Sequence, residues 1–129
     1  MVRVEPGVWS ALEYACHVRD VFLVQRERVV LAQVKDRPSL APMSRDERVS
    51  ICRYDAQSPA VVVDQLVMAT ELLALVFEGL TPAGLARPLL YSFPAPEVRD
   101  VAWVGRHTVH EGTHHWGDVH RVLGRATQR

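Results

Sequence analysis

Cysteine, runs of like charge and long uninterrupted apolar stretches are all scarce in this 129-residue sequence, and each scarcity excludes a class of protein. The two cysteines, Cys16 and Cys52, are too few for a disulfide framework, so we expect two buried or half-buried thiols. Fifteen basic and fifteen acidic residues give a net charge of zero, and no run of Lys or Arg forms the basic patch that binds phosphate backbones. We therefore expect no nucleic acid partner.

Signals for secretion and for membrane insertion are also lacking. The amino terminus has no apolar stretch followed by a small-residue cleavage site, so no secretory signal is predicted. The most apolar window, residues 61–77, is interrupted by Asp64, Gln65, Thr70 and Glu71, which favours a buried helix over a membrane span. The sequence therefore predicts a cytosolic protein without a membrane partner. Its length predicts a single domain, residues 1–129.

The first long helix has a clear start and a clear stop. Ser10-Ala-Leu-Glu13 has the pattern of a capping box, and Trp9 before it can pack on Tyr14. The helix should begin at Ala11 and continue until Asp36-Arg-Pro38, because proline cannot extend it.

Two further long helices are predicted. Ser58-Pro59 is typical of a helix start, and the helix that follows reaches Gly79; it is apolar around much of its circumference, so it should lie inside a bundle. The last long helix should begin near Glu97 and end by Gly124. Between the long helices we expect a short helix after Ser44, one turn after Thr81, and a proline-rich connecting loop over residues 87–96. The predicted fold class is therefore all-α.

Five of the six histidines lie between His107 and His120, on the last helix. On a helical wheel centred on His115, the stripe that faces the core also carries Glu111, with Asp118 beside the pair. A buried carboxylate and imidazole are costly unless a partner satisfies them, and residues four apart can present both groups to one divalent ion.

His17 lies on the apolar side of the first helix and is the natural third ligand, so the candidate metal site is His17, Glu111 and His115. Hydrogen bonding to buried partners, without a metal, explains the Glu111 and His115 pair equally well. His107 and Asp118 are candidate catalytic residues, which would orient a ligand or move protons. His110 and His114 point off the stripe and should be flanking or exposed.

Two glycines of the same helix, Gly105 and Gly112, share a face. Each glycine inside a helix costs about 1 kcal/mol relative to alanine, so a reason for their presence is needed. Close approach of another helix is the expected reason.

Segments at both ends of the chain resemble a known family. Residues 7–20, around Trp9 and His17, resemble the helix with the first metal histidine in the DinB-like superfamily, which includes mycothiol-dependent maleylpyruvate isomerases. Residues 107–118 resemble its last bundle helix, where the isomerase branch holds zinc or nickel through a glutamate that follows a histidine and a second histidine four residues later. In this sequence those positions are Glu111, preceded by His110, and His115.

The resemblance implies a four-helix bundle, yet family members usually carry a complete helix before the segment that contains Trp9. The expected fold is therefore a DinB-like bundle without the usual first helix, in which three long helices are supplemented by short helical segments or by a second copy in a homodimer. The carboxy-terminal domain of the isomerases is also missing, which makes maleylpyruvate isomerisation doubtful.

The resulting functional hypothesis is a metal-dependent enzyme, holding zinc or nickel, that transfers a small-molecule thiol of the mycothiol type to a small electrophile. The choice of thiol transfer rests on the resemblance, because the three ligands by themselves fit hydrolysis equally well. The rival hypothesis is a non-catalytic bundle, with or without metal, that acts as an interaction or stress-related protein.

Overall fold

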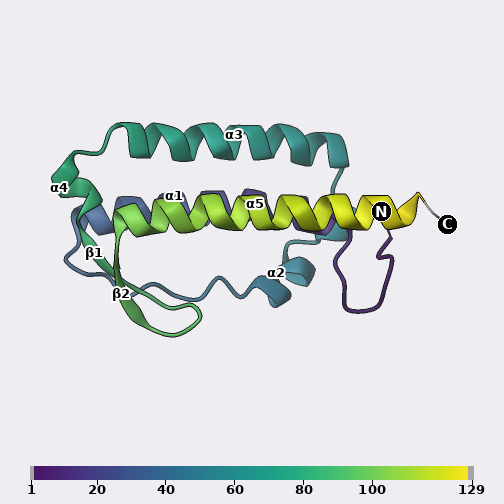
Figure 1. Ribbon diagram of the computed structural model, residues 1–129, viewed down its shortest axis with the longest axis horizontal. Coiled ribbons are helices and arrows are strands. Elements are labelled where there is room, and N and C mark those ends of the chain that lie inside the picture. Colours follow the sequence, from purple (N-terminus) through teal and green to yellow (C-terminus); the bar gives the residue numbers. More distant parts are fainter. Residues whose placement is uncertain (1, 128–129) are drawn as a thin grey trace.

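Three long helices build the computed structural model, which describes residues 2–127: α1 (Ala11–Val34), α3 (Pro59–Glu78) and α5 (Val101–Ala126). α1 and α3 run in the same direction and α5 runs opposite to them (Figure 1). α1 is the central helix because it packs against both of the others. The short helical elements are α2 (Arg45–Ile51), the 3-10 turn η1 (Tyr54–Ala56) and α4 (Pro82–Leu85). The predicted helical architecture, with three long helices and short segments, is confirmed.

The start of α1 is the predicted capping box. The Ser10 hydroxyl accepts a hydrogen bond from the Glu13 backbone N–H at 3.2 Å, and the Glu13 carboxylate accepts one from the Ser10 N–H at 2.7 Å. The rings of Trp9 and Tyr14 lie 5.4 Å apart, as expected for an apolar contact across the cap. These local interactions fix where α1 begins, and with it the position of His17 in the second turn.

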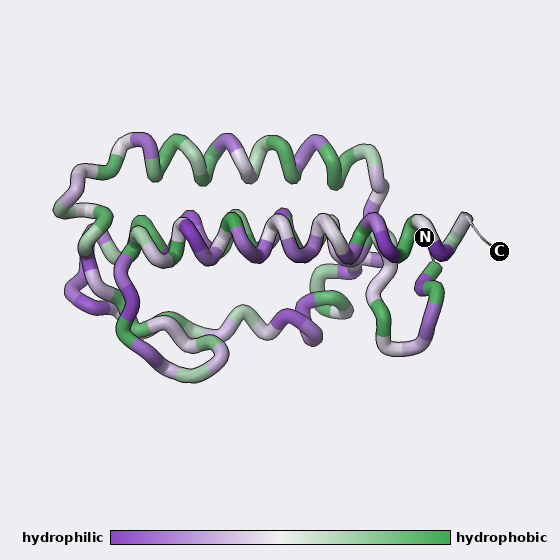
Figure 2. The backbone as a smooth tube through the Cα atoms, viewed as in Figure 1, coloured by the Kyte–Doolittle hydropathy of each residue, from purple (hydrophilic) through white to green (hydrophobic). Residues whose placement is uncertain are grey.

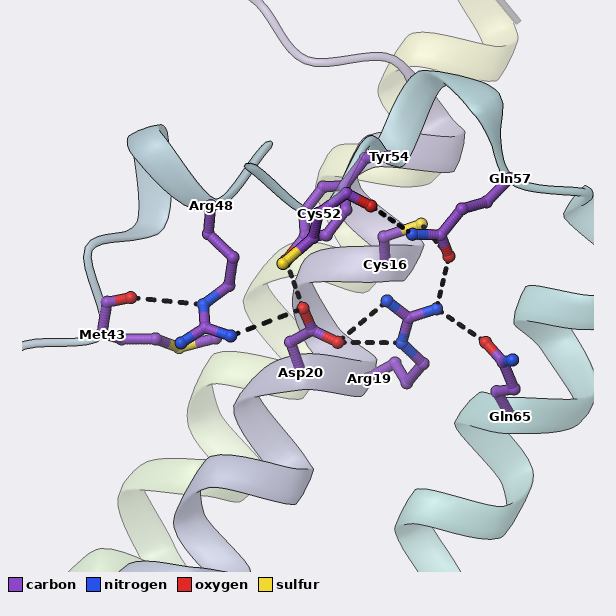
Figure 3. A network of polar contacts seen from close by, with 9 residues as sticks. All are labelled: Cys16, Arg19, Asp20, Met43, Arg48, Cys52, Tyr54, Gln57 and Gln65. Atoms are coloured by element: carbon purple, nitrogen blue, oxygen red, sulfur yellow. Dashed lines mark hydrogen bonds and ion pairs between the residues drawn. The ribbon is translucent and has the colours of Figure 1, made fainter. Parts of the chain in front are cut away.

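A long crossover, residues 35–58, returns the chain to the start of α3 and contains α2 and η1. α2 forms where predicted, but Ser44 adopts a left-handed backbone conformation and its side chain makes no cap hydrogen bond. A buried polar network holds the crossover against α1 and α3 (Figure 3). Arg19 donates to Gln57 at 2.6 Å and to Gln65 at 2.7 Å, and the Tyr54 hydroxyl donates to Asp20 at 2.6 Å.

The proline-rich segment predicted as a connecting loop is instead a β-hairpin. Strands β1 (Pro88–Tyr91) and β2 (Glu97–Asp100) pair antiparallel, with Pro88 opposite Asp100 and Tyr91 opposite Glu97. α5 therefore begins at Val101 and not near Glu97, and Asp100 caps it by accepting from the Trp103 N–H at 2.7 Å. Prolines that exclude a helix are compatible with short edge strands, so a proline-rich segment can form a hairpin as well as a loop.

The expectation that α3 lies inside the bundle is wrong for the described chain. Only Val62, Ala69 and Leu73 of α3 are buried. Five of its large apolar side chains are exposed: Val61, Val63, Val67, Met68 and Leu75. Figure 2 shows hydrophobic residues along the whole length of this helix. α3 is long and apolar enough to cross a membrane by length and composition, with 17% of its most apolar window buried.

Two apolar clusters pack the ends of α1. One joins Trp9, Leu12, Cys16, Tyr54 and other residues near the start of α1, and burial raises the pKa of the Cys16 thiol to about 11, so this thiol stays protonated. The other cluster joins the end of α1 to β1 and the start of α5 through Val29, Leu89 and Val104. Both cysteines are free, as predicted, and the middle of α1 faces α5 between the two clusters.

The two glycines expected at close helix contacts occupy such positions. A Cβ atom on Gly105 would lie 2.9 Å from the Phe77 ring of α3, and one on Gly112 would lie 3.2 Å from the Phe22 ring of α1. Gly117 has no such neighbour within 4 Å. Close approach therefore explains Gly105 and Gly112, and not Gly117.

This difference predicts opposite outcomes for two alanine substitutions in α5. Gly117→Ala should raise the free energy of unfolding by about 1 kcal/mol, because alanine is the better helix former and meets no neighbour. Gly105→Ala should be less stable than Gly117→Ala by at least ~1 kcal/mol, because the Phe77 ring must move. Urea denaturation of both variants measures the difference, and equal stabilisation would contradict the close contact of α5 with α3.

Candidate metal centre

His17, Glu111 and His115 come together between α1 and α5. One possible ligand atom from each residue lies within 4.8 Å of the other two. His115 Nε2 is 3.4 Å from the Glu111 carboxylate, and the rings of His17 and His115 are 4.9 Å apart and nearly perpendicular. α5 supplies two of the residues from successive turns of the stripe that the wheel predicted, and α1 supplies the third.

Two nitrogens of this group are buried and unpartnered among residues 2–127. His17 Nδ1 has no hydrogen-bond partner, and the 3.4 Å contact of His115 Nε2 with the Glu111 carboxylate lacks the geometry of a hydrogen bond, although both side chains are at least nine-tenths buried. An unsatisfied buried polar atom costs roughly 1–3 kcal/mol, which favours a missing partner for both nitrogens. A divalent cation held by two imidazoles and a carboxylate would satisfy them together.

Burial and neighbouring charges give the two histidines opposite pKa shifts. Burial, reinforced by the nearby His115, lowers the pKa of His17 to about 4, so its ring is neutral at pH 7 with a free lone pair. Contact with the Glu111 carboxylate, together with Asp118, raises the pKa of His115 against the effect of burial. The contact with His115 in turn lowers the pKa of Glu111, so this carboxylate is ionised.

Asp118 lies on the far side of His115 from this centre. Its carboxylate is 3.0 Å from His115 Nδ1 and accepts a hydrogen bond from Arg121 at 2.7 Å. Although burial opposes it, the contacts with His115 and Arg121 hold the pKa of Asp118 below its usual value. A hydrogen bond from His115 Nδ1 to Asp118 leaves Nε2 with its lone pair free and fixes the ring orientation.

A cavity of about 440 Å³ opens beside the three residues. His107 lies in its wall, one turn before Glu111, stacked on Trp103 with the ring centroids 4.6 Å apart; burial lowers the pKa of His107. His110 and His114 are exposed as expected, although His114 reaches the cavity rim. Asp118 does not line the cavity, so of the two candidate catalytic residues only His107 is placed to contact a ligand.

Several cavity residues were not predicted from the sequence. Gln25 and Arg28 come from later turns of α1, and Tyr91 comes from β1. Arg28 could have been found, because it is eleven residues after His17, about three helical turns, and so lies on nearly the same side of the helix. No helical spacing links Tyr91 to the other site residues, because Tyr91 lies on strand β1 and not on a helix.

The sequence profile of the DinB superfamily matches residues 2–119. The chain belongs to the DinB superfamily. Among solved structures, YfiT from Bacillus subtilis, described as a probable metal-dependent hydrolase with an unusual four-helix bundle topology, matches with a TM-score of 0.79 and 16% sequence identity. The match covers 98% of this chain and 71% of the YfiT chain, and it confirms the predicted DinB-like fold. No curated protein matches the sequence significantly.

Membership of the DinB superfamily and the convergent residues together point to a divalent metal site, which predicts a specific pattern of losses. Zinc titrated into the purified protein should bind near one equivalent, and His17→Ala, Glu111→Ala and His115→Ala should each abolish stoichiometric binding. Asp118→Asn should keep the site but weaken zinc affinity by roughly 10–100-fold, because only the orientation of His115 is disturbed.

The matched control is His110→Ala, which removes an exposed histidine from the same helix and should bind zinc as the wild type does. Isothermal titration calorimetry measures all five variants. Unchanged zinc binding in the variants of the three convergent residues would show that these residues are not the zinc ligands.

Proposed function

We propose that this DinB-superfamily protein is a metal-dependent transferase that joins a small-molecule thiol to an electrophilic carbon. The observation that carries the proposal is the pair of unpartnered nitrogens, on His17 and His115, facing an ionised Glu111 at the edge of a cavity. Buried polar atoms in folded proteins are nearly always paired, which favours a missing partner for these two nitrogens over a purely structural cluster. A site that holds an ion and admits a small molecule accounts for both features.

In this proposal His17, Glu111 and His115 hold zinc or nickel, and Asp118 keeps His115 oriented. When bound, a divalent ion lowers the pKa of a coordinated thiol or water and so supplies a nucleophile near pH 7. His107 is the cavity base: its ring, neutral because burial lowers its pKa, can accept the proton that the thiol releases. The new bond is between sulfur and carbon, and the leaving group departs with the electrons of the bond that breaks.

The choice of a thiol rests on the resemblance of His110, Glu111 and His115 to the isomerase branch, and mycothiol is the thiol we propose to test. We place the activity in the cytosol, where such thiols are kept reduced and free cysteines persist. Hydrolysis is the second candidate, because YfiT is described as a probable metal-dependent hydrolase. The same residues would serve it, with water in place of the thiol.

Two assays run in parallel separate these reactions. Zinc-loaded protein should accelerate the conjugation of mycothiol to monochlorobimane, and Glu111→Ala should lose at least about 100-fold, as expected when a ligand to a catalytic ion is removed. His107→Ala should lose roughly 10²-fold or more in kcat while keeping its zinc, because it removes only the base.

Hydrolysis of p-nitrophenyl acetate, measured in parallel, tests the second candidate. Ester cleavage without thiol consumption would favour the hydrolase. Zinc binding without either reaction, across a panel of electrophiles and esters, would favour a non-catalytic interaction protein.

We further propose that a second copy of the chain covers the exposed apolar side chains of α3. They form two lines along the helix, Val61, Met68 and Leu75 in one and Val63 and Val67 in the other, with the exposed acids Asp64 and Glu71 between the lines. α3 contains no Lys or Arg and its charged residues are all acidic, which disfavours an anionic membrane surface as the occupant. A two-fold dimer packs these apolar side chains against the same ones of the second copy and removes them from water on both copies.

The dimer predicts a molar mass of twice the 14.5 kDa of one chain in light scattering after gel filtration. Val63→Glu combined with Val67→Glu should give the mass of one chain, because two buried charges would face the partner. The control is Val109→Glu, an equally large change at a 70% exposed valine of α5, which should remain dimeric. A monomeric wild type would contradict the dimer.

A further inference from the structure

A second polar cluster lines the cavity at the end away from His17. Gln25 and Arg28 of α1 meet Tyr91 of β1 there, and all three are cavity residues. Arg28 is eleven residues beyond His17, a rise of roughly 16 Å along the helix on nearly the same side. The candidate metal centre does not use this cluster.

The cluster has more hydrogen-bond donors than acceptors. The Tyr91 hydroxyl accepts from Gln25 Nε2 at 2.8 Å and from Arg28 Nη1 at 3.4 Å, so its own hydrogen is free, and within residues 2–127 it has no acceptor. Arg28 also donates to Gln25 Oε1 at 3.1 Å and to the Ala41 carbonyl at 2.6 Å. Tyr91 is 5% exposed, so its free donor is almost entirely removed from bulk solvent.

The charge of the cluster is also uncompensated. Arg28 makes no ion pair with any acid of the described chain; its guanidinium lies over the Tyr91 ring at 5.3 Å. Burial lowers the pKa of Arg28, the nearby Arg48 lowers it further, and the contact with Tyr91 opposes both. Of the acids in the cavity wall, Glu111 belongs to the metal end and Glu47 is exposed. A guanidinium keeps its charge under these conditions, so an anion is the natural missing partner.

We propose that Arg28 and Tyr91 bind the carboxylate of a small substrate whose reactive carbon lies at the metal end of the same cavity. The inference rests on the proposed function, because it assigns substrate recognition to one end of the cavity and the reaction to the metal end. A single guanidinium balances the one negative charge of a carboxylate better than the near-double charge of a phosphate. Val21, Met43 and Phe93 line the cavity as well, which suits an apolar chain behind the acid group.

A purely structural role for Arg28 is the competing explanation. Its contacts with Tyr91 and Ala41 fasten the hairpin and the crossover to α1 whether or not a ligand binds. That role uses the Nη1 and Nη2 donors of Arg28 and leaves the Tyr91 hydroxyl hydrogen without an acceptor. The test therefore needs a readout that structure alone would not change, namely a preference for an acid over its neutral amide.

Calorimetric titration of the metal-free protein with hexanoate and with hexanamide provides this readout. Hexanoate should bind at least tenfold more tightly than hexanamide, and Arg28→Gln should remove that preference. Tyr91→Phe should weaken hexanoate binding several-fold with little effect on hexanamide, because only one donor is lost. Arg26→Gln, which changes an arginine of α1 that does not line the cavity, is the matched control and should behave as the wild type.

The assignment would be overturned if the wild type showed no preference for hexanoate, or if the preference survived in Arg28→Gln. It would also be overturned if the wild type bound hexyl phosphate more tightly than hexanoate. Loss of the preference in Arg45→Gln alone would place the anion at the other cavity arginine and would overturn it too. If Arg28→Gln unfolds, the preference for hexanoate is measured in Arg28→Lys and Tyr91→Phe, which keep most of the packing. A preference that both variants leave unchanged would contradict the assignment. The use of metal-free protein separates the carboxylate site from the proposed metal site, because the hexanoate measurement does not depend on zinc binding.

Discussion

The constraint on which the rest of the structure depends is the burial of two imidazoles and a carboxylate against one another, between α1 and α5. Each unpartnered nitrogen lowers the stability of the fold by an amount comparable to a lost hydrogen bond, so the bundle tolerates the group only if something compensates it. Asp118 and Arg121 hold His115 from behind, and the apolar cluster around Trp9 and Cys16 holds the start of α1. The surrounding chain thus stabilises an arrangement that its own hydrogen bonds do not complete.

α1 organises the cavity along its length. Its cap fixes the position of His17. Val21, Gln25 and Arg28 follow His17 at helical spacing and line the same cavity. The crossover and the hairpin then close the sides, because both are tied back to α1 by buried side-chain hydrogen bonds. One helix therefore sets the distance between the end that would hold an ion and the end that would hold an anion.

α3 shows where inference from hydropathy stops. Its composition correctly indicates a helix that prefers apolar surroundings, but hydropathy carries no information on how many neighbours are present. In the described chain α3 packs chiefly on α1, so much of the same apolar surface faces outward. The proposed dimer is one way in which such a surface becomes covered.

The sequence by itself determined the features that depend on local interactions: the capped start of α1, the approximate positions of the three long helices, and the placement of Glu111 and His115 on one stripe of α5. It also singled out His17, because an imidazole on an apolar side needs a partner. Tertiary structure alone decided that His17 meets α5, that Tyr91 reaches the cavity and that α3 stays exposed. Residue patterns report helical periodicity and caps within a few turns, whereas strand pairing over residues 88–100 and helix contacts depend on which surfaces meet after the chain has turned back on itself.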